Sequence, residues 1–343
     1  MPPLIIPVFI THHGCPHRCI FCDQHAIAGR PRSRGDVTGA EVVSIIEQWL
    51  ARPRKRPAAS VQVAFYGGSF TGLPDQRQQE LLGAVAPYRQ SGRVDSIRLS
   101  TRPDYISPGS IAVLKEHGVG CVELGVQSLA PEVLATSARG YTVACVEKAV
   151  DLLKSAGFMV GLQLMVGLPG ETTVEMIASA RRTVALQPDF VRIYPVLVLR
   201  NTGLHRLYTA GKYRPLSIHE AVARTGRVKS IFEQAEIKVV RVGLQPSAEL
   251  EEKVAAGPYH PAFGELVASR LLFNRTRRLL TQVEDGDVRQ VTIASADISA
   301  FRGPGNRNMK RLQTLGLLRK MQLVCDPDQR RQTVSLQKSI GRR

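Results

Sequence analysis

Short apolar runs rich in β-branched residues recur along the first 245 residues of this 343-residue chain. Helical patterns lie between most of these runs, and such an alternation predicts parallel strands joined by crossover helices. The runs are continuous rather than alternating, so we expect strands buried on both faces, in a barrel or a doubly wound sheet. They span residues 5–10, 61–66, 96–99, 119–126, 159–166, 189–199 and 237–244.

Helix boundaries are marked by capping residues and by glycines. A capping box, in which two side chains each accept from the other's backbone N–H, is predicted at three helix starts. At the other end, a glycine provides the left-handed turn that precedes the next strand, as expected at Gly118 and Gly157. The three boxes pair Thr38 with Glu41, Thr172 with Glu175, and Ser217 with Glu220.

The pattern changes near residue 246. We therefore expect an α/β domain over residues 1–245 and a small α+β extension over residues 246–343. Within the extension, the sequence predicts a helix at 265–280 and strands at 290–294 and 332–336.

Charge is distributed unevenly. Residues 200–343 carry 26 Lys and Arg against 13 Asp and Glu, a net charge of +13, whereas residues 1–199 carry +4. A basic excess of this size is typical of contact with nucleic acid phosphates, although a solvated basic surface is an equal alternative.

Six cysteines and the N-terminal sequence indicate the compartment. Three of the cysteines crowd between positions 15 and 22, which is unlike a secreted disulfide framework. The first apolar run, 4–10, contains Pro7 and is too short to span a bilayer, so we expect no signal peptide, no membrane contact and a cytoplasmic protein.

The strongest chemical motif is Cys15-x₃-Cys19-x₂-Cys22, directly after the first predicted strand. Three thiolates on one loop can hold a [4Fe–4S] cluster and leave its fourth iron without a protein ligand. That iron can chelate S-adenosylmethionine (SAM) for reductive cleavage. The alternative is a structural zinc site, which requires a fourth ligand. Its candidates are His12, His13, His17 and His25.

Polar residues and glycines follow the other predicted strands at their carboxyl ends. In a (β/α) barrel this rim gathers catalytic and cofactor-binding residues. Each also has a simpler interpretation, such as a tight turn at the glycines or an ion pair between Arg102 and Asp104. The candidates are Gly67, Gly68 and Ser69, then Ser100, Thr101 and Arg102, then Glu123 and Gln127, then Gly167.

Taken in order, these motifs resemble the radical SAM superfamily, and more narrowly the radical SAM core of the Elongator catalytic subunit and its short bacterial relatives. The resemblance covers about residues 5–245. The residues that carry it lie in the cysteine loop and in Gly67–Pro74, Ser100–Tyr105, Glu123–Ser128, Gly167–Gly170 and Arg192–Leu204.

The resemblance implies an open six-stranded (β/α) partial barrel with SAM across its mouth. It assigns Cys15, Cys19 and Cys22 to the cluster, Gly67 and Gly68 to the SAM ammonium group, and Ser69 to SAM binding. Ser100, Thr101, Arg102 and Gln127 would face the nucleoside, and Leu164, Met165 and Gly167 would line the adenine.

The implied cofactors are a [4Fe–4S] cluster and SAM, with an electron donor of the flavodoxin or ferredoxin type. The implied activity is a radical reaction, with tRNA or another RNA as the candidate substrate. A small metabolite or a porphyrin is an alternative substrate, and a non-catalytic zinc and RNA-binding protein is a second alternative. Residues 246–343 show no acetyl-CoA phosphate loop, so we do not expect acetyl transfer from this segment.

Overall fold

The computed structural model describes residues 3–10, 15, 19–28, 36–53 and 59–338. Contacts between Cα atoms divide the chain into two compact units. The first comprises residues 1–218 and 228–259, and the second comprises residues 219–227 and 260–343. Residues 246–259, which the sequence places in the extension, thus group with the first unit. Among the described residues, no helix combines the length and the apolar character that crossing a bilayer requires.

The first unit is built on a seven-stranded sheet in which every neighbouring pair is parallel. Strand order follows sequence order, so each crossover moves one position in the same direction. The strands are β1 (Leu4–Phe9), β2 (Val61–Tyr66), β3 (Ser96–Thr101), β4 (Val119–Gln127), β5 (Met159–Val166), β6 (Phe190–Pro195) and β8 (Lys238–Val242).

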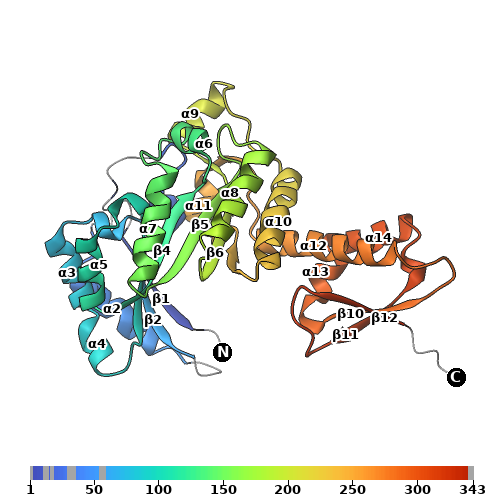
Figure 1. Cartoon of the computed structure of the whole chain (residues 1–343), viewed down its shortest axis with the longest axis horizontal. Helices are drawn as coiled ribbons and strands as arrows, with labels where there is room; N and C mark the ends of the chain where they lie inside the picture. Colours follow the sequence, from blue (N-terminus) through green and yellow to red (C-terminus); the bar gives the residue numbers. More distant parts are fainter. Residues whose placement is uncertain (1–2, 11–14, 16–18, 29–35, 54–58, 339–343) are drawn as a thin grey trace. The chain divides into compact units, whose positions relative to one another are not determined.

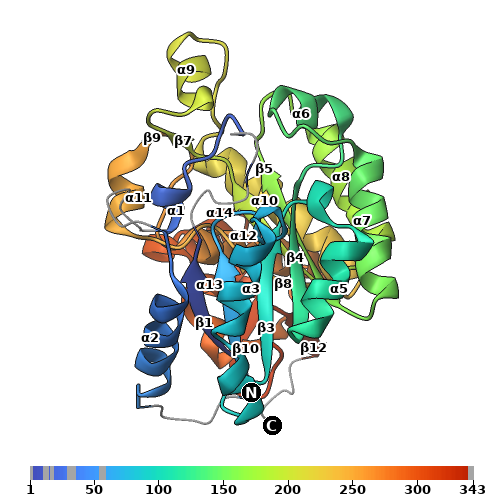
Figure 2. The same cartoon turned by 90° about the vertical axis from the view of Figure 1, so that its left-hand side faces the viewer.

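The helices of this unit include the crossover helices, and Figures 1 and 2 show α5, α7 and α8 side by side along the outer face of the sheet. The helices are α1 (Gln24–Ala28), α2 (Gly39–Leu50), α3 (Asp75–Gly83), α4 (Ala86–Gln90), α5 (Pro108–Glu116), α6 (Pro131–Thr136), α7 (Val143–Ser155), α8 (Thr173–Ala185), α9 (Gly203–Thr209), α10 (Ile218–Gln234, which enters the second unit) and α11 (Ala248–Lys253).

The sheet is curled, as one hydrogen bond demonstrates. In a flat sheet, β2 and β6 would lie about 19 Å apart, because four strand spacings of about 4.8 Å separate them. Yet Arg192 Nη2 on β6 donates to the Tyr66 hydroxyl on β2 over 3.1 Å. The two side chains can meet only across the concave interior. The expected partial (β/α) barrel is therefore confirmed, with β1 and β8 as its two edges.

The expected number of six strands is wrong, because the apolar run 237–244 also enters the sheet. It forms β8 and pairs in parallel with β6. The run 189–199 is likewise not one strand. Proline lacks the N–H that a ladder needs, and β6 ends at Pro195. The chain then forms β7 (Val198–Leu199), which pairs antiparallel with β9 (Val254–Ala256) in a separate small sheet.

Of the three capping boxes predicted from the sequence, one is confirmed in full and one in part, and the box of Ser217 and Glu220 stays a prediction. Thr172 and Glu175 form the complete capping box at the start of α8, and the Thr38 side chain caps α2 by accepting from the Glu41 N–H. Gly118 and Gly157 have φ of +68° and +81°, the left-handed conformation expected after α5 and α7. The two glycines end these helices just before the next parallel strands begin.

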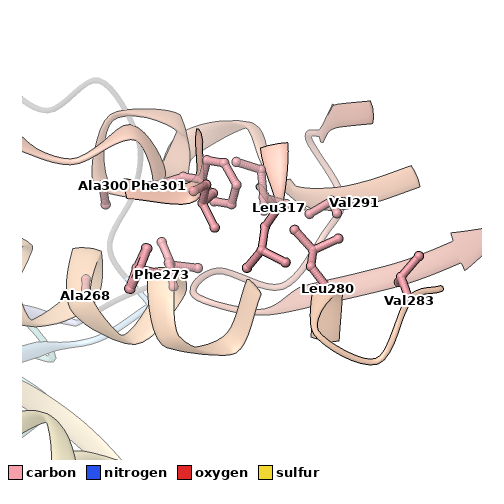
Figure 3. Packing of buried hydrophobic residues seen from close by; sticks show 11 residues of the cluster. Ala268, Phe273, Leu280, Val283, Val291, Ala300, Phe301 and Leu317 are labelled. Carbon is pink, nitrogen blue, oxygen red and sulfur yellow. The ribbon is translucent and has the colours of Figure 1, made fainter. Parts of the chain in front are cut away.

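The second unit packs helices against a three-stranded sheet of order β11-β10-β12. The predicted helix and two strands are confirmed as α12, β10 and β12, whereas β11 and two short helices were not predicted. The elements are α12 (Phe263–Leu280), β10 (Arg289–Ala294), α13 (Ile298–Arg302), α14 (Arg307–Thr314), β11 (Met321–Asp326) and β12 (Val334–Lys338). Figure 3 shows its core, where Phe273 of α12 and Phe301 of α13 lie in one cluster with Val291 of β10.

Candidate active site

The three motif cysteines follow β1 at its carboxyl end. Cys19 is buried, and the Cys22 N–H donates to the Cys19 carbonyl over 3.1 Å, which holds these two residues in one tight turn. Burial, and then the negative charge of Cys19, raise the pKa of the Cys15 and Cys22 thiols above their ordinary value. A cationic metal centre would stabilise these thiols as thiolates.

The cysteines do not form a complete metal site by themselves. Among the described residues, no three Cys, His, Asp or Glu side chains stand together as a preformed set of metal ligands. Of the zinc candidates, His12, His13 and His17 lie outside the described residues, as does the side chain of His25. Cluster ligation by Cys15, Cys19 and Cys22 therefore stays a prediction.

Two buried arginines surround the Cys19 sulfur. Arg139 Nη1 donates to Cys19 Sγ over 2.8 Å, and Arg102 Nη1 lies 4.0 Å from the same atom. Each arginine is only 4% exposed. A cubane held by three thiolates carries net negative charge, and two guanidinium groups provide the opposite charge where water is excluded. The residues present therefore fit the group that the cysteine motif predicts.

Arg139 was not identified from the sequence. It also donates to the Gly125 carbonyl over 2.5 Å and to the Tyr141 hydroxyl over 2.7 Å, so it connects the cysteine loop to the end of β4. A lone arginine after the short helix α6 has no local pattern that distinguishes it from a surface residue. Its role is visible only in the folded chain, where its side chain is buried beside Cys19.

The predicted residues after β2 and β3 come together. The Ser69 hydroxyl lies 2.9 Å from that of Thr101 and accepts from the Arg102 N–H over 3.2 Å. Gly67 has φ of +93°, a conformation that favours glycine, and Ser100 Oγ donates to the Phe65 carbonyl over 3.4 Å. The hydroxyls of Ser69 and Thr101 bond to each other, so they fix the shape of this edge.

Arg102 is held by several partners. Its Nε and Nη2 donate to the two Asp104 carboxylate oxygens at 2.9 and 2.7 Å, and Nη2 also donates to the Arg139 carbonyl at 2.6 Å. The loop ion pair that the sequence offered as the simpler alternative is thus present. It is compatible with a site role, because the same guanidinium also faces Cys19.

The predicted residues on β4 and β5 form a second group. Gln127 has φ of +68° at a register shift between the two strands, and Gln163 Nε2 donates to its side-chain oxygen over 3.2 Å. Gln127, Leu164 and Met165 line one small cavity. Gly68 follows Gly67 in the loop after β2.

Gly167 begins the loop after β5 with φ of +95°. Its N–H donates to Glu171 Oε2 over 2.6 Å, and its carbonyl accepts from the Tyr213 hydroxyl over 2.7 Å. A Cβ here would lie 2.8 Å from Leu216 Cδ1, so a larger residue would have to displace the Leu216 side chain as well as adopt a conformation that favours glycine. These partners hold the loop beside Leu164 and Met165.

Glu123 lies in the concave interior of the sheet, within a buried network of charged and polar groups. Its carboxylate accepts from Arg98 over 3.1 Å and from Arg192 Nη2 over 3.0 Å, and its Oε2 lies 2.5 Å from Arg192 Nε in an ion pair. The Tyr66 hydroxyl donates to Glu123 over 2.9 Å, and burial and the charge of Glu123 raise the pKa of Tyr66. Tyr66 is therefore a neutral donor, next to the glycines that follow β2.

Comparison with models of known protein families identifies the family of this chain. The model of the radical SAM superfamily matches residues 9–182, and that of the radical SAM C-terminal domain matches residues 188–272. The chain belongs to the radical SAM superfamily. It is therefore an enzyme of a superfamily whose members use a [4Fe–4S] cluster and SAM.

Curated relatives of this radical SAM protein include one that is named as a tRNA-modifying enzyme. A tRNA uridine(34) acetyltransferase of Methanocaldococcus infernus is 29% identical over 66% of this chain and 49% of its own length. Elongator complex protein 3 of Homo sapiens is 25% identical over 78% of this chain and 55% of its own. The chain thus spans about half the length of these curated relatives.

A solved structure agrees with the fold. The archaeal Methanocaldococcus infernus Elp3, lacking its N-terminal residues, has a TM-score of 0.60 at 22% identity, over 78% of this chain and 62% of the solved one. The radical SAM partial barrel is therefore supported by a structure as well as by sequence.

Proposed function

We propose that Cys15, Cys19 and Cys22 hold a [4Fe–4S] cluster and that the carboxyl ends of β2 to β5 bind SAM. The observation that carries this proposal is the environment of the Cys19 sulfur. Cys19 is buried in the cysteine motif, and its sulfur accepts a hydrogen bond from the buried Arg139. When bound, the reduced cluster supplies one electron that splits SAM into methionine and a 5′-deoxyadenosyl radical, which abstracts a hydrogen atom from the substrate.

The chain's own residues would bind and orient SAM. Carbonyls beside Gly67 and Gly68 would accept from the SAM ammonium group, because glycine lets the backbone approach closely. Leu164 and Met165 would cover the adenine while Gln127 provides a polar contact, next to the loop that starts at Gly167. The packed interior beneath them would exclude water from a reactive radical.

The substrate that we propose is RNA, in particular tRNA. Support comes from the name of the archaeal relative, a tRNA uridine(34) acetyltransferase, and from the net charge of +13 over residues 200–343. An electron donor of the flavodoxin or ferredoxin type would reduce the cluster. The activity of the whole relatives is not transferred, because this chain covers about half of their length.

The test uses anaerobically reconstituted full-length protein with dithionite and SAM. We expect about four irons per chain and release of 5′-deoxyadenosine that bulk tRNA stimulates. Zinc in place of iron, with no nucleoside released, would contradict the radical chemistry. Nucleoside release that tRNA does not affect, but that a small metabolite or a porphyrin stimulates, would contradict the RNA substrate alone.

Arg139 provides a test that does not depend on turnover. Arg139→Met removes a positive charge and a hydrogen bond from the Cys19 sulfur, so the reduction potential of the reconstituted cluster should become more negative. The measurement is a potentiometric titration followed by electron paramagnetic resonance. Arg182→Met, which removes an exposed guanidinium on α8, is the control. Equal potentials in the two variants would refute the role of Arg139.

A further inference from the structure

The second unit contains two short helices joined by a tight turn. Helix α13 ends at Arg302 and α14 begins at Arg307, so four residues, 303–306, connect them. Gly303, Gly305 and Asn306 all have positive φ, of +74°, +55° and +62°. A turn of three or four residues that contains glycine is the connection used in helix-turn-helix motifs, where the second helix is presented to nucleic acid.

The turn is fixed from beneath by a buried asparagine. Asn308 Nδ2 donates to Ser269 Oγ over 2.9 Å and to the Phe301 carbonyl over 3.0 Å. A Cβ on Gly303 would lie 3.0 Å from the Asn308 side chain, and residues other than glycine rarely adopt its φ of +74°. Phe301 and Leu312 anchor the two helices in the core. The outward face of α14 is therefore held by a rigid support.

That outward face is cationic. Arg302, Arg307 and Lys310 are exposed, and none of the three forms an ion pair with a described residue. Arg311 is also exposed and packs its guanidinium over the Phe273 ring at 4.1 Å. Unpaired cations on a fixed helix are free to pair with an external anion.

Several acidic groups of this unit already have cationic partners elsewhere. Asp285 pairs with Lys320, Asp287 with Arg289, and the buried Asp297 with Arg331. Over residues 260–343 there are 16 Lys and Arg against 7 Asp and Glu. The surplus charge of the unit is therefore not neutralised at α14.

A hollow of about 640 Å³ lies on the same face. Arg302, Lys310, Asn306 and Gln313 line it together with apolar side chains, and no acidic residue lines it. Amides and cations together are the donors that phosphate and sugar oxygens accept from. The helix dipole at the start of α14 adds partial positive charge.

We propose that the turn and outward face of α13 and α14 bind the phosphate backbone of structured RNA. The backbone is the shared chemistry of RNA and DNA, and the choice of RNA rests on the proposed function. Binding of this kind is insensitive to base sequence and strongly dependent on salt, because each neutralised phosphate releases counterions. This part of the chain would hold the substrate, whereas the radical chemistry belongs to the barrel.

The test compares two triple variants of the full-length chain that lose the same charge. The site variant is Arg302→Gln/Arg307→Gln/Lys310→Gln. The control is Lys115→Gln/Lys148→Gln/Lys154→Gln, on exposed positions of α5 and α7. The dissociation constant for bulk tRNA is measured by fluorescence anisotropy over a series of salt concentrations, with duplex DNA of similar length as a second probe.

We expect the site variant to weaken tRNA binding about tenfold or more, and to reduce the slope of log K against log salt by about two to three. The control should change the dissociation constant by less than about twofold. Equal tRNA affinity in the two variants would overturn the proposal, and duplex DNA bound as tightly as tRNA would overturn the assignment to RNA.

The same variants separate this inference from the proposed function. Iron content and the release of 5′-deoxyadenosine from SAM without tRNA should be unchanged in the site variant, because its residues lie outside the barrel. If wild-type protein cleaves no SAM but binds tRNA through α14, the proposed chemistry fails and the binding site stands. If wild-type protein cleaves SAM and the site variant binds tRNA normally, the binding site fails and the proposed chemistry stands.

Discussion

Replacing Cys15, Cys19 or Cys22 by alanine, one at a time, is expected to reduce iron from about four per chain to less than one and to abolish 5′-deoxyadenosine release. In the proposed cluster, each thiolate would supply one of the three protein ligands, so each substitution would leave only two of them. The measurements are iron and sulfide content after anaerobic reconstitution, followed by nucleoside analysis with SAM and dithionite.

Other cysteines provide the matched control. Cys325 is exposed on β11 and Cys145 lies near the start of α7, and both are free thiols. Cys325→Ala and Cys145→Ala should retain full iron content and nucleoside release. Full iron content in all three motif variants would overturn the cluster assignment, whatever their activity.

Glu123→Gln is expected to destabilise the barrel by about 3–5 kcal/mol, because it leaves Arg98 and Arg192 buried without their counter-charge. Glutamine keeps the volume but replaces an acceptor oxygen with a donor that faces other donors. For a unit of this size, the loss corresponds to a fall in Tm of roughly 10 °C or more. Thermal unfolding followed by circular dichroism measures it.

Glu147→Gln is the matched control, since it removes the same charge from an ion pair with arginine that is exposed. Glu147 and Arg182 lie 3.1 Å apart on the surface of α7 and α8. Exposed pairs contribute little, so Tm should change by less than about 2 °C. A similar fall in both variants would mean that the buried network is not a major source of stability.

Much of the barrel could be predicted because its signals are local. Capping at Thr172, the glycines after α5 and α7, and the apolar runs each depend on residues a few positions apart. The predictions were wrong where the outcome depended on tertiary pairing rather than on a local pattern. Nothing in the run 237–244 distinguishes an edge strand of the sheet from an isolated one, and only pairing with β6 makes it the seventh strand.

The second unit was less predictable, because α13 and α14 span only five and eight residues. Helical periodicity needs about three turns to be distinguished from chance. Their boundaries depend instead on Asn308, whose partners lie on other elements. The loop between α13 and α14 has no distinctive motif in the sequence, yet it carries the proposed binding face.

By itself, the sequence determined the alternation of strands and helices and the residue types at each strand end, including the three cysteines. The tertiary structure alone decided the partners: Arg139 beside the Cys19 sulfur, 120 positions away, and Arg192 beside Tyr66, 126 positions away. The reason is physical. Hydrogen bonds within helices and helix caps are set by neighbours in the chain, whereas contacts across the barrel arise from twist accumulated over seven strands.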